Sequence, residues 1–259
     1  FQQAHDQHGL AETYDLLGMT GFIGGDLVQS TNYYQQAVTL FQELDDRQGL
    51  ASSLMMFGIS GGGYQSETVV PASFSFAEAL RLGERALQIA REIGQRSAEA
   101  YTLLVLGHYL GPRGEYARAL EMAQASLALT EQIEHRQWMT FAHWEVGVLY
   151  LDLLALPEAR QHLEQALALA QEIGSRHWIL VVSGFLAPAY LLQQDFTKAE
   201  AILTAALGAD AAMQTIGQRL VWAARAELAL ARGDPGQALD ITERLIASAA
   251  NLSDENVIP

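Results

Sequence analysis

The stretch Gly58-Ile59-Ser60-Gly61-Gly62-Gly63 is the part of this sequence that most resembles a catalytic motif. It contains a G-x-S-x-G match, the pattern that presents a nucleophilic serine on a turn between a strand and a helix in many hydrolases. Its glycines also resemble a phosphate-binding loop, in which backbone N–H groups surround the phosphate. Either chemistry requires particular elements around Ser60, so the surrounding pattern decides between them.

The pattern around Ser60 predicts a helix rather than a strand. Residues 48–57 carry apolar side chains at helical spacing, and no Lys-Ser or Lys-Thr follows the glycines. We therefore expect no catalytic serine here, and a hydrolase that uses Ser60 is kept as the alternative. Residues 61–75 are predicted to be an insertion in a loop. Insertions in repeat proteins often gather on the binding face, so this one has a candidate function too.

Other candidate chemistry is sparse. His5, Asp6 and His8 lie close together near the first residue, but no further ligands with closed spacing accompany them, so no metal site is expected. His108 and His143 fall on predicted helices, where a packed histidine is the simpler interpretation. No paired-carboxylate, dinucleotide or kinase signature is found. The sequence predicts no enzyme activity, no cofactor and no metal.

Composition narrows the choice of partners. Half of the 259 residues are apolar and the formal net charge is −15, with a single lysine among the 15 basic residues. Such a charge repels nucleic acid and anionic membrane surfaces. Cysteine is absent, which fits a reducing compartment, and we expect a cytoplasmic location. The longest apolar run, 178–192, has 15 residues, short of the ~20 that a membrane span needs.

Five related segments recur along the chain and end in arginine: ELDDR, EIGQR, QIEHR, EIGSR and TIGQR. The arginines are Arg47, Arg96, Arg136, Arg176 and Arg219, at intervals of 49, 40, 40 and 43 residues. A small residue follows each segment at an equivalent place in an apolar helical pattern. An insertion of nine residues in the second repeat explains the long interval.

Each repeat is predicted to form two helices, for example 98–110 and 116–133, joined by a turn. Small residues such as Gly107 and Ala119 would allow the two helices to approach closely. Gly94, Gly174 and Gly217 are predicted to form left-handed caps after the second helix. The recurring arginines are predicted to complement the negative end of that helix.

This pattern resembles the tetratricopeptide repeat family in its form of about forty residues. The resemblance is carried by Leu-Gly pairs (106–107), Gly-Asp or Gly-Glu turns (114–115) and Ala-Leu pairs (119–120). It implies an all-α, right-handed superhelical solenoid of about six antiparallel helix pairs in a single domain. The expected repeats are 8–47, 48–96, 97–136, 137–176, 177–219 and 220–259, with residues 1–7 as the tail of a preceding repeat. The chain is expected to be a fragment of a longer array.

In tetratricopeptide arrays one face of the first helices lines the inner surface. The resemblance places Glu12, Asp15 and Ser52 on this face and implies a candidate binding site farther along it. The site residues are Tyr101, His108, Phe141, Trp144, Val148, Val181, Gly184 and Pro188. The first four form an aromatic cluster, which is either exposed for binding or covered by a tight superhelix. Trp138, Trp178 and Trp222 are predicted to pack in the core. Gly184 and Pro188 are predicted to leave a dent beside Trp144, because one lacks a side chain and the other lacks an N–H.

The EIGxR ends resemble the C-terminal repeat or sensor regions of bacterial signal-transduction ATPases and of transcription regulators related to the maltose activator. That resemblance implies a non-catalytic module that binds a peptide, a partner domain or a small effector in the concave groove. The charge favours a partner that is basic at its rim and apolar at its centre, or a sugar-like ligand stacked on Trp144. Self-association through uncapped ends is expected, and a purely architectural spacer is the remaining alternative.

Overall fold

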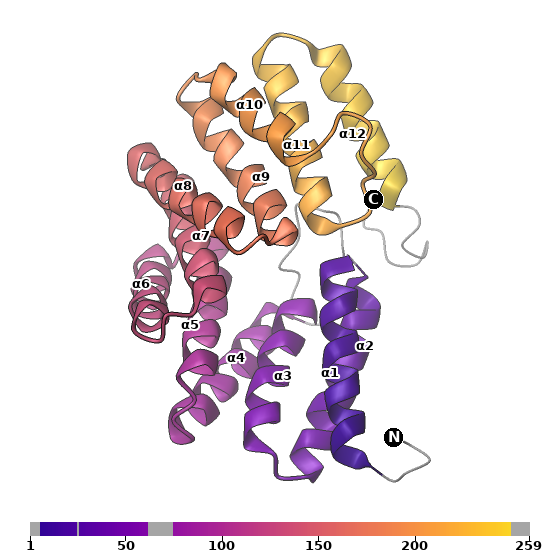
Figure 1. The fold of residues 1–259 in the computed structure, drawn as a ribbon, viewed down its shortest axis with the longest axis vertical. Helices are drawn as coiled ribbons and strands as arrows, with labels where there is room; N and C mark the ends of the chain where they lie inside the picture. Colours follow the sequence, from indigo (N-terminus) through magenta and orange to yellow (C-terminus); the bar gives the residue numbers. More distant parts are fainter. Residues whose placement is uncertain (1–5, 25, 62–74, 250–259) are drawn as a thin grey trace. The chain divides into compact units, whose positions relative to one another are not determined.

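The computed structural model describes residues 6–24, 26–61 and 75–249, and these form helices and turns without any strand (Figure 1). The elements are α1 (Gln7–Gly24), α2 (Leu27–Glu43), α3 (Arg47–Gly61), α4 (Phe76–Glu92), α5 (Arg96–Leu110), the 3-10 turn η3 (Gly111–Arg113), α6 (Tyr116–Gln132), α7 (Arg136–Asp152), α8 (Leu156–Glu172), α9 (Arg176–Leu192), α10 (Phe196–Ala206), α11 (Ile216–Ala231) and α12 (Pro235–Ala249). The predicted all-α fold of successive helix pairs is confirmed.

The chain divides into two compact units, one containing α1–α6 and the other α7–α12. Within unit 1 each helix packs against the next, and the first helices of successive pairs also contact one another, α1 with α3 and α3 with α5. Unit 2 repeats this arrangement, with α7 against α9 and α9 against α11. The first helices thus form an inner layer in each unit. A single domain over residues 1–259 remains a prediction.

Small residues permit the close pairing of helices, as the sequence predicts. A Cβ placed on Gly147 would lie 2.7 Å from Leu163 Cγ, and one on Gly107 would lie 3.0 Å from the Ala119 carbonyl oxygen. Ala119, on the facing helix α6, is completely buried. A larger side chain at these places would separate the helix axes, so the repeated glycine and alanine positions determine the hairpin geometry.

The turns after the helices are left-handed, but glycine does not always occupy them. Gly94 (φ 70°) and Gly174 (φ 66°) confirm the predicted caps. Leu154 (φ 57°) has the same conformation without the freedom of glycine. The prediction for Gly217 is wrong, because this residue lies inside α11, where a Cβ would be 2.8 Å from Leu180 Cβ.

The recurring arginines begin the inner helices instead of following the outer ones. Arg47, Arg96 and Arg136 are the first residues of α3, α5 and α7, so the predicted role at a helix C-terminus is wrong for them. Arg136 Nη1 reaches Glu172 Oε2, at the end of the next outer helix, over 3.2 Å. Arg47 makes the equivalent ion pair with Glu92. Arg47 and Arg136 therefore each link the start of a hairpin to the end of its own outer helix.

Helix α10 departs from the other outer helices. It has 11 residues, whereas α2, α4, α6 and α8 each have 17. The helix ends because Leu207 is extended (φ −148°, ψ 131°), and residues 207–215 form an irregular segment before α11. The outer layer of unit 2 is consequently about 9 Å shorter at this point, at 1.5 Å per residue.

Candidate functional site

Ser60 lies within a helix and is buried, so the hydrolase geometry is not formed. Ser60 is 2% exposed, and its Oγ lies 2.9 Å from Ser30 Oγ. Ser30 Oγ–H donates to the Gly18 carbonyl at 2.8 Å, so the proton between the two serines comes from Ser60. A nucleophile elbow requires a strand before an exposed serine, whereas Ser60 lies inside α3. Ser60 acts as a packing and hydrogen-bonding residue, while most of the glycine run and the predicted insertion lie outside the described residues.

The eight predicted site residues are divided between the two units. Tyr101 and His108 belong to α5 of unit 1, and both are half-buried. The other six belong to α7 and α9 of unit 2. Tyr101 O–H donates to Met56 Sδ at 2.7 Å, and burial raises its pKa above the ordinary value. A groove shared by all eight residues remains a prediction.

In unit 2 the aromatic residues pack against one another. The centroid of the Trp144 ring lies 5.4 Å from that of Phe141, 5.9 Å from that of Trp178 and 5.3 Å from that of Phe185. Trp144 is 2% exposed and Phe141 is 3% exposed. Of the two sequence interpretations, the structure matches the covered one. A sugar-like ligand stacked on Trp144 is therefore not supported.

The predicted dent at Gly184 is wrong. A Cβ on this residue would lie 2.7 Å from Leu220 Cβ and 3.1 Å from the Leu220 carbonyl carbon. The missing side chain lets α9 and α11 pack closely, so the space is filled. Helix α9 continues through Pro188, which is half-buried. Val148 and Val181 are buried as well, at 8% and 6% exposure.

The predicted core tryptophans behave as expected in two cases out of three. Trp178 and Trp222 are 8% and 4% exposed, which confirms their packing role. Trp138 is half-buried, and its ring stacks on His135 with 5.1 Å between centroids.

An open cavity of about 590 Å³ occurs in unit 1. Its walls come from α1, from the end of α2, from the start of α3 and from Gln95. Three lining residues, Glu12, Asp15 and Ser52, are among those that the tetratricopeptide pattern assigns to the inner face. Glu12, Asp15 and Asp46 supply three carboxylates, and neither lysine nor arginine is among the lining residues. The cavity can therefore attract a cationic group.

The acidic cavity has defined polar contacts. His8 Nε2 lies 3.0 Å from Asp46 Oδ2, and His8 Nδ1 lies 3.7 Å from Glu12 Oε1. Ser53 Oγ–H donates to Asp15 Oδ1 at 2.5 Å. Burial raises the pKa of Asp15, and the Ser53 hydrogen bond opposes that increase. Asp15 is thus a partly desolvated carboxylate, for which a cationic partner would be favourable.

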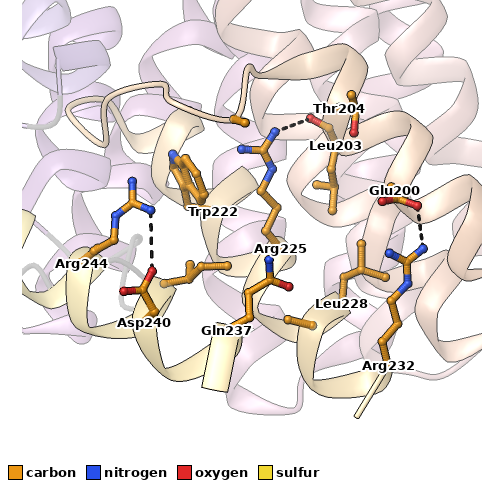
Figure 2. Close-up of a pocket in the computed structure, with 13 residues that line it drawn as sticks. Glu200, Leu203, Thr204, Trp222, Arg225, Leu228, Arg232, Gln237, Asp240 and Arg244 are labelled. Carbon is orange, nitrogen blue, oxygen red and sulfur yellow. Dashed lines mark hydrogen bonds and ion pairs between the residues drawn. The ribbon is translucent and has the colours of Figure 1, made fainter. Parts of the chain in front are cut away.

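A second cavity, of about 350 Å³, lies among α10, α11 and α12 of unit 2 (Figure 2). Trp222 lies between two arginines, with Arg225 Cζ 4.5 Å and Arg244 Cζ 4.9 Å from the ring centroid. Arg232 lies farther along the cavity, paired with Glu200 at 2.7 Å. Sequence reasoning missed this cavity. The sequence did indicate a departure here, because Arg176 and Arg219 are 43 residues apart instead of 40. This longer interval includes the irregular segment after α10.

Two histidines meet in unit 2. His143 Nδ1 on α7 is 3.1 Å from His162 Nδ1 on α8, and the Tyr150 ring stacks on His162. Burial lowers the pKa of His143 to about 4, with a smaller effect from His162, and burial also lowers the pKa of His162. These side chains are neutral at physiological pH and pack as predicted for His143.

Within the described ranges, no group of three or more His, Asp or Glu side chains is arranged to hold a metal ion. His5, one of the residues considered as a ligand, lies outside those ranges. None of the helices described is long and apolar enough to cross a lipid bilayer.

The stacked helix pairs define the class of the protein: an α-helical repeat scaffold with an inner layer of first helices. The model of the tetratricopeptide repeat family matches residues 139–212. These residues are tetratricopeptide repeats, and the other described pairs have the same fold.

Known proteins similar to the chain include a Rap protein complexed with competence and sporulation factor, at a TM-score of 0.73 and 16% identity over 92% of this chain and 66% of that one. A signal-transduction ATPase with numerous domains and a tetratricopeptide repeat sensor, from Pyrococcus horikoshii, has a TM-score of 0.56 at 16% identity over 94% and 37% of the two chains. The curated outer dynein arm-docking complex subunit 4 of Bos taurus is 26% identical over 47% of this chain and 17% of its own length.

These similarities establish the fold, and the chain spans only part of the length of these three proteins. Tetratricopeptide arrays are protein-interaction folds and are generally non-catalytic scaffolds. A site on such an array is therefore sought on its surfaces rather than around a catalytic group.

Proposed function

We propose that this chain is a non-catalytic interaction and sensing module of a larger bacterial regulatory protein, located in the cytoplasm. It binds a peptide or partner domain on the inner face of its repeats. The observation that carries the proposal is the open cavity of unit 1, because Glu12, Asp15 and Ser52 come from that face. A small effector in place of a peptide is the narrower version of the same proposal.

The chemistry of the cavity defines the partner. Three carboxylates with no lysine or arginine among the lining residues favour a segment that carries Lys or Arg. Phe41 and Leu16 also line the cavity and favour an apolar side chain beside the cation. In this proposal Tyr101 and His108 continue the inner face of unit 1. The six predicted site residues of unit 2 serve as packed support.

The relatives are consistent with this function. One structural neighbour is a Rap protein in complex with competence and sporulation factor, and another is an ATPase whose repeats are named as its sensor. Their identity to this chain is low, so they support the class of function and leave the ligand to be determined by the cavity itself.

The test uses an array of peptides in which Lys or Arg flanks an apolar residue, with Glu-substituted copies as the matched set. Binding is measured by titration calorimetry for the wild type and for Glu12→Gln/Asp15→Asn. We expect selective binding of the basic set and a loss of roughly tenfold or more in affinity in the double variant, as for charged pairs at an interface.

The control variant Glu121→Gln/Glu131→Gln removes the same charge from exposed positions of α6. An equal loss of affinity in the control would show that only net charge matters and would reject the cavity. Absence of binding by every peptide would favour the architectural spacer.

Self-association is also part of the proposal. Leu230, Leu239 and Ile246 on α11 and α12 are 62%, 59% and 59% exposed. A second copy of the chain could cover them. Sedimentation of Leu239→Glu/Ile246→Glu should then show less dimer than the wild type at the same concentration.

A further inference from the structure

The cavity of unit 2 exists because helix α10 is short. Its end at Ala206 leaves part of α11 without an outer helix above it, and residues of α10, α11 and α12 line the resulting space. The volume of about 350 Å³ falls at the lower end of the range for small-ligand pockets. The apolar walls include Leu203, Leu228 and Ile241.

Arg225 supports the rim of this cavity through backbone carbonyls. Its Nη1 donates to the Gly208 carbonyl at 3.1 Å, and its Nη2 donates to the Leu203 carbonyl at 3.2 Å and to the Leu207 carbonyl. The Leu203 carbonyl also accepts the Leu207 N–H. The Leu207 and Gly208 carbonyls lie just beyond the end of α10, so Arg225 holds the end of this helix to α11. Among the described residues, Arg225 is not paired with a carboxylate, and burial lowers its pKa from the ordinary value.

Arg244 adds a second positive charge on the other side of the Trp222 ring in the view of Figure 2. Its Nη1 is 3.9 Å from Asp240 Oδ2, too long for a hydrogen bond. Its side chain is 49% exposed, so its donors can reach a ligand in the cavity. Two guanidinium groups at one aromatic ring repel each other, and an anion near both would reduce that repulsion.

The charges that line the cavity are unequal. Arg225, Arg232 and Arg244 supply three positive charges, while Glu200 and Asp240 supply two negative charges. Glu200 is occupied by Arg232, so the surplus lies near Trp222. This is a local reversal of sign in a chain with a net charge of −15.

We propose that this cavity binds a small anionic group attached to an apolar body. The carboxylate or phosphate lies near Arg244 and Trp222, and the apolar part lies against Leu203 and Leu228. Arg is suited to this role because its planar fork of N–H donors matches carboxylate and phosphate oxygens. The site is separate from the acidic cavity of unit 1, and its ligand is independent of the peptide proposed there.

The test is a titration of the full chain, ¹⁵N-labelled, followed by the indole Nε1–H signal of Trp222, assigned with Trp222→Phe. That N–H donates to the Ala211 carbonyl at 3.2 Å, so it reports on the cavity. Three probes are used: benzoate, phenyl phosphate and a blocked peptide with one glutamate. The probe that binds most tightly identifies the source of the anion as a free carboxylate, a phosphate ester or an acidic partner.

We expect a saturable shift with at least one probe and a loss of roughly tenfold or more in affinity for Arg244→Gln. The matched control Arg118→Gln, at an exposed position of α6, should bind as the wild type does. Gln237→Glu adds a carboxylate to the lining from an exposed position and should weaken binding as well, with Gln124→Glu as its control.

Two results would overturn the proposal: no saturable shift with any probe at millimolar concentration, or equal affinities of the wild type and both cavity variants. Far-ultraviolet circular dichroism checks that each variant is folded. Glu12→Gln/Asp15→Asn should leave this binding unchanged, so failure of the peptide proposal and failure of the anion proposal are distinguishable.

Discussion

The two units are built from the same kind of helix pair, but their cavities carry side chains of opposite charge. In unit 1 the inner helices α1 and α3 leave an open space lined by three carboxylates. In unit 2 the inner helices carry tightly packed aromatic residues, and the open space lies instead beside the short outer helix, with three arginines. Repeat geometry thus sets where side chains project, whereas local packing and helix length decide which face is left open.

The closed inner face of unit 2 predicts the largest effect. Gly184→Leu should lower the free energy of unfolding by about 3 kcal/mol, because its side chain would overlap Leu220 and force α9 and α11 apart. Guanidinium titration followed by circular dichroism measures the change. Gly208→Leu is the matched control, since nothing lies within 4 Å of its added Cβ. Equal stability of Gly184→Leu and the wild type would mean that this face is open after all.

The rim of the arginine cavity predicts the next effect. Arg225→Gln removes the donors that reach the Leu203, Leu207 and Gly208 carbonyls, and should lower the free energy of unfolding by about 2 kcal/mol. Arg118→Gln, which loses an exposed ion pair, should change it by less than about 0.5 kcal/mol. Urea titrations of the two variants make the comparison. Similar losses would show that Arg225 is not a cap for the short helix.

Acid should lower the folding stability of unit 2, because this unit contains a buried histidine, His143, that must remain neutral. Burial lowers the folded-state pKa of His143 to about 4, below the ordinary value of 6.5. The stability that comes from keeping the ring neutral is therefore fully present above pH 6.5 and is lost as the pH falls towards 4.

His143→Gln should make the melting temperature depend less on pH in this window. Part of the dependence should persist, because burial also lowers the pKa of His177 to about 4. Melting curves from pH 7 to pH 4 provide the measurement. The same dependence in wild type and variant would contradict a protonation cost at His143.

Substitution of Asp15 should have the smallest effect on stability. The effect should be a small increase, whereas the loss of a hydrogen-bonding contact alone would lower stability. Burial raises its folded-state pKa, so the ionised carboxylate is disfavoured at neutral pH. Asp15→Asn should raise the melting temperature slightly at pH 7, and the difference should vanish below the ordinary pKa of 3.8. A fall in melting temperature at pH 7 would show that the Ser53 hydrogen bond outweighs burial. A variant that is more stable yet binds basic peptides less well would identify Asp15 as a binding residue.

Much of the fold could be predicted from sequence because the relevant information is local and repeated. Gly107 and Ala119 occupy places where helices must approach, and their recurrence at about forty residues shows which helix pairs with which. The roles of the arginines could not be predicted in the same way. Arg136 binds Glu172, 36 residues away, and that contact depends on how the next hairpin folds back.

The site was harder to predict than the fold. The tetratricopeptide resemblance assigned Glu12, Asp15 and Ser52 to the inner face, and these residues do line a cavity. The same resemblance placed Phe141 and Trp144 on the inner face, but it carries no information about what covers them. Exposure depends on neighbouring elements, and a repeat pattern treats all neighbours as alike.

The sequence by itself determined the helix pairs, their approximate length and the absence of a catalytic setting for Ser60, since each follows from side-chain spacing along one segment. Tertiary structure alone decided that Leu220 fills the space beside Gly184 and that a cavity lies beside Trp222 near the end of α10. Both outcomes depend on atoms brought together from different repeats, whose distances no linear pattern records.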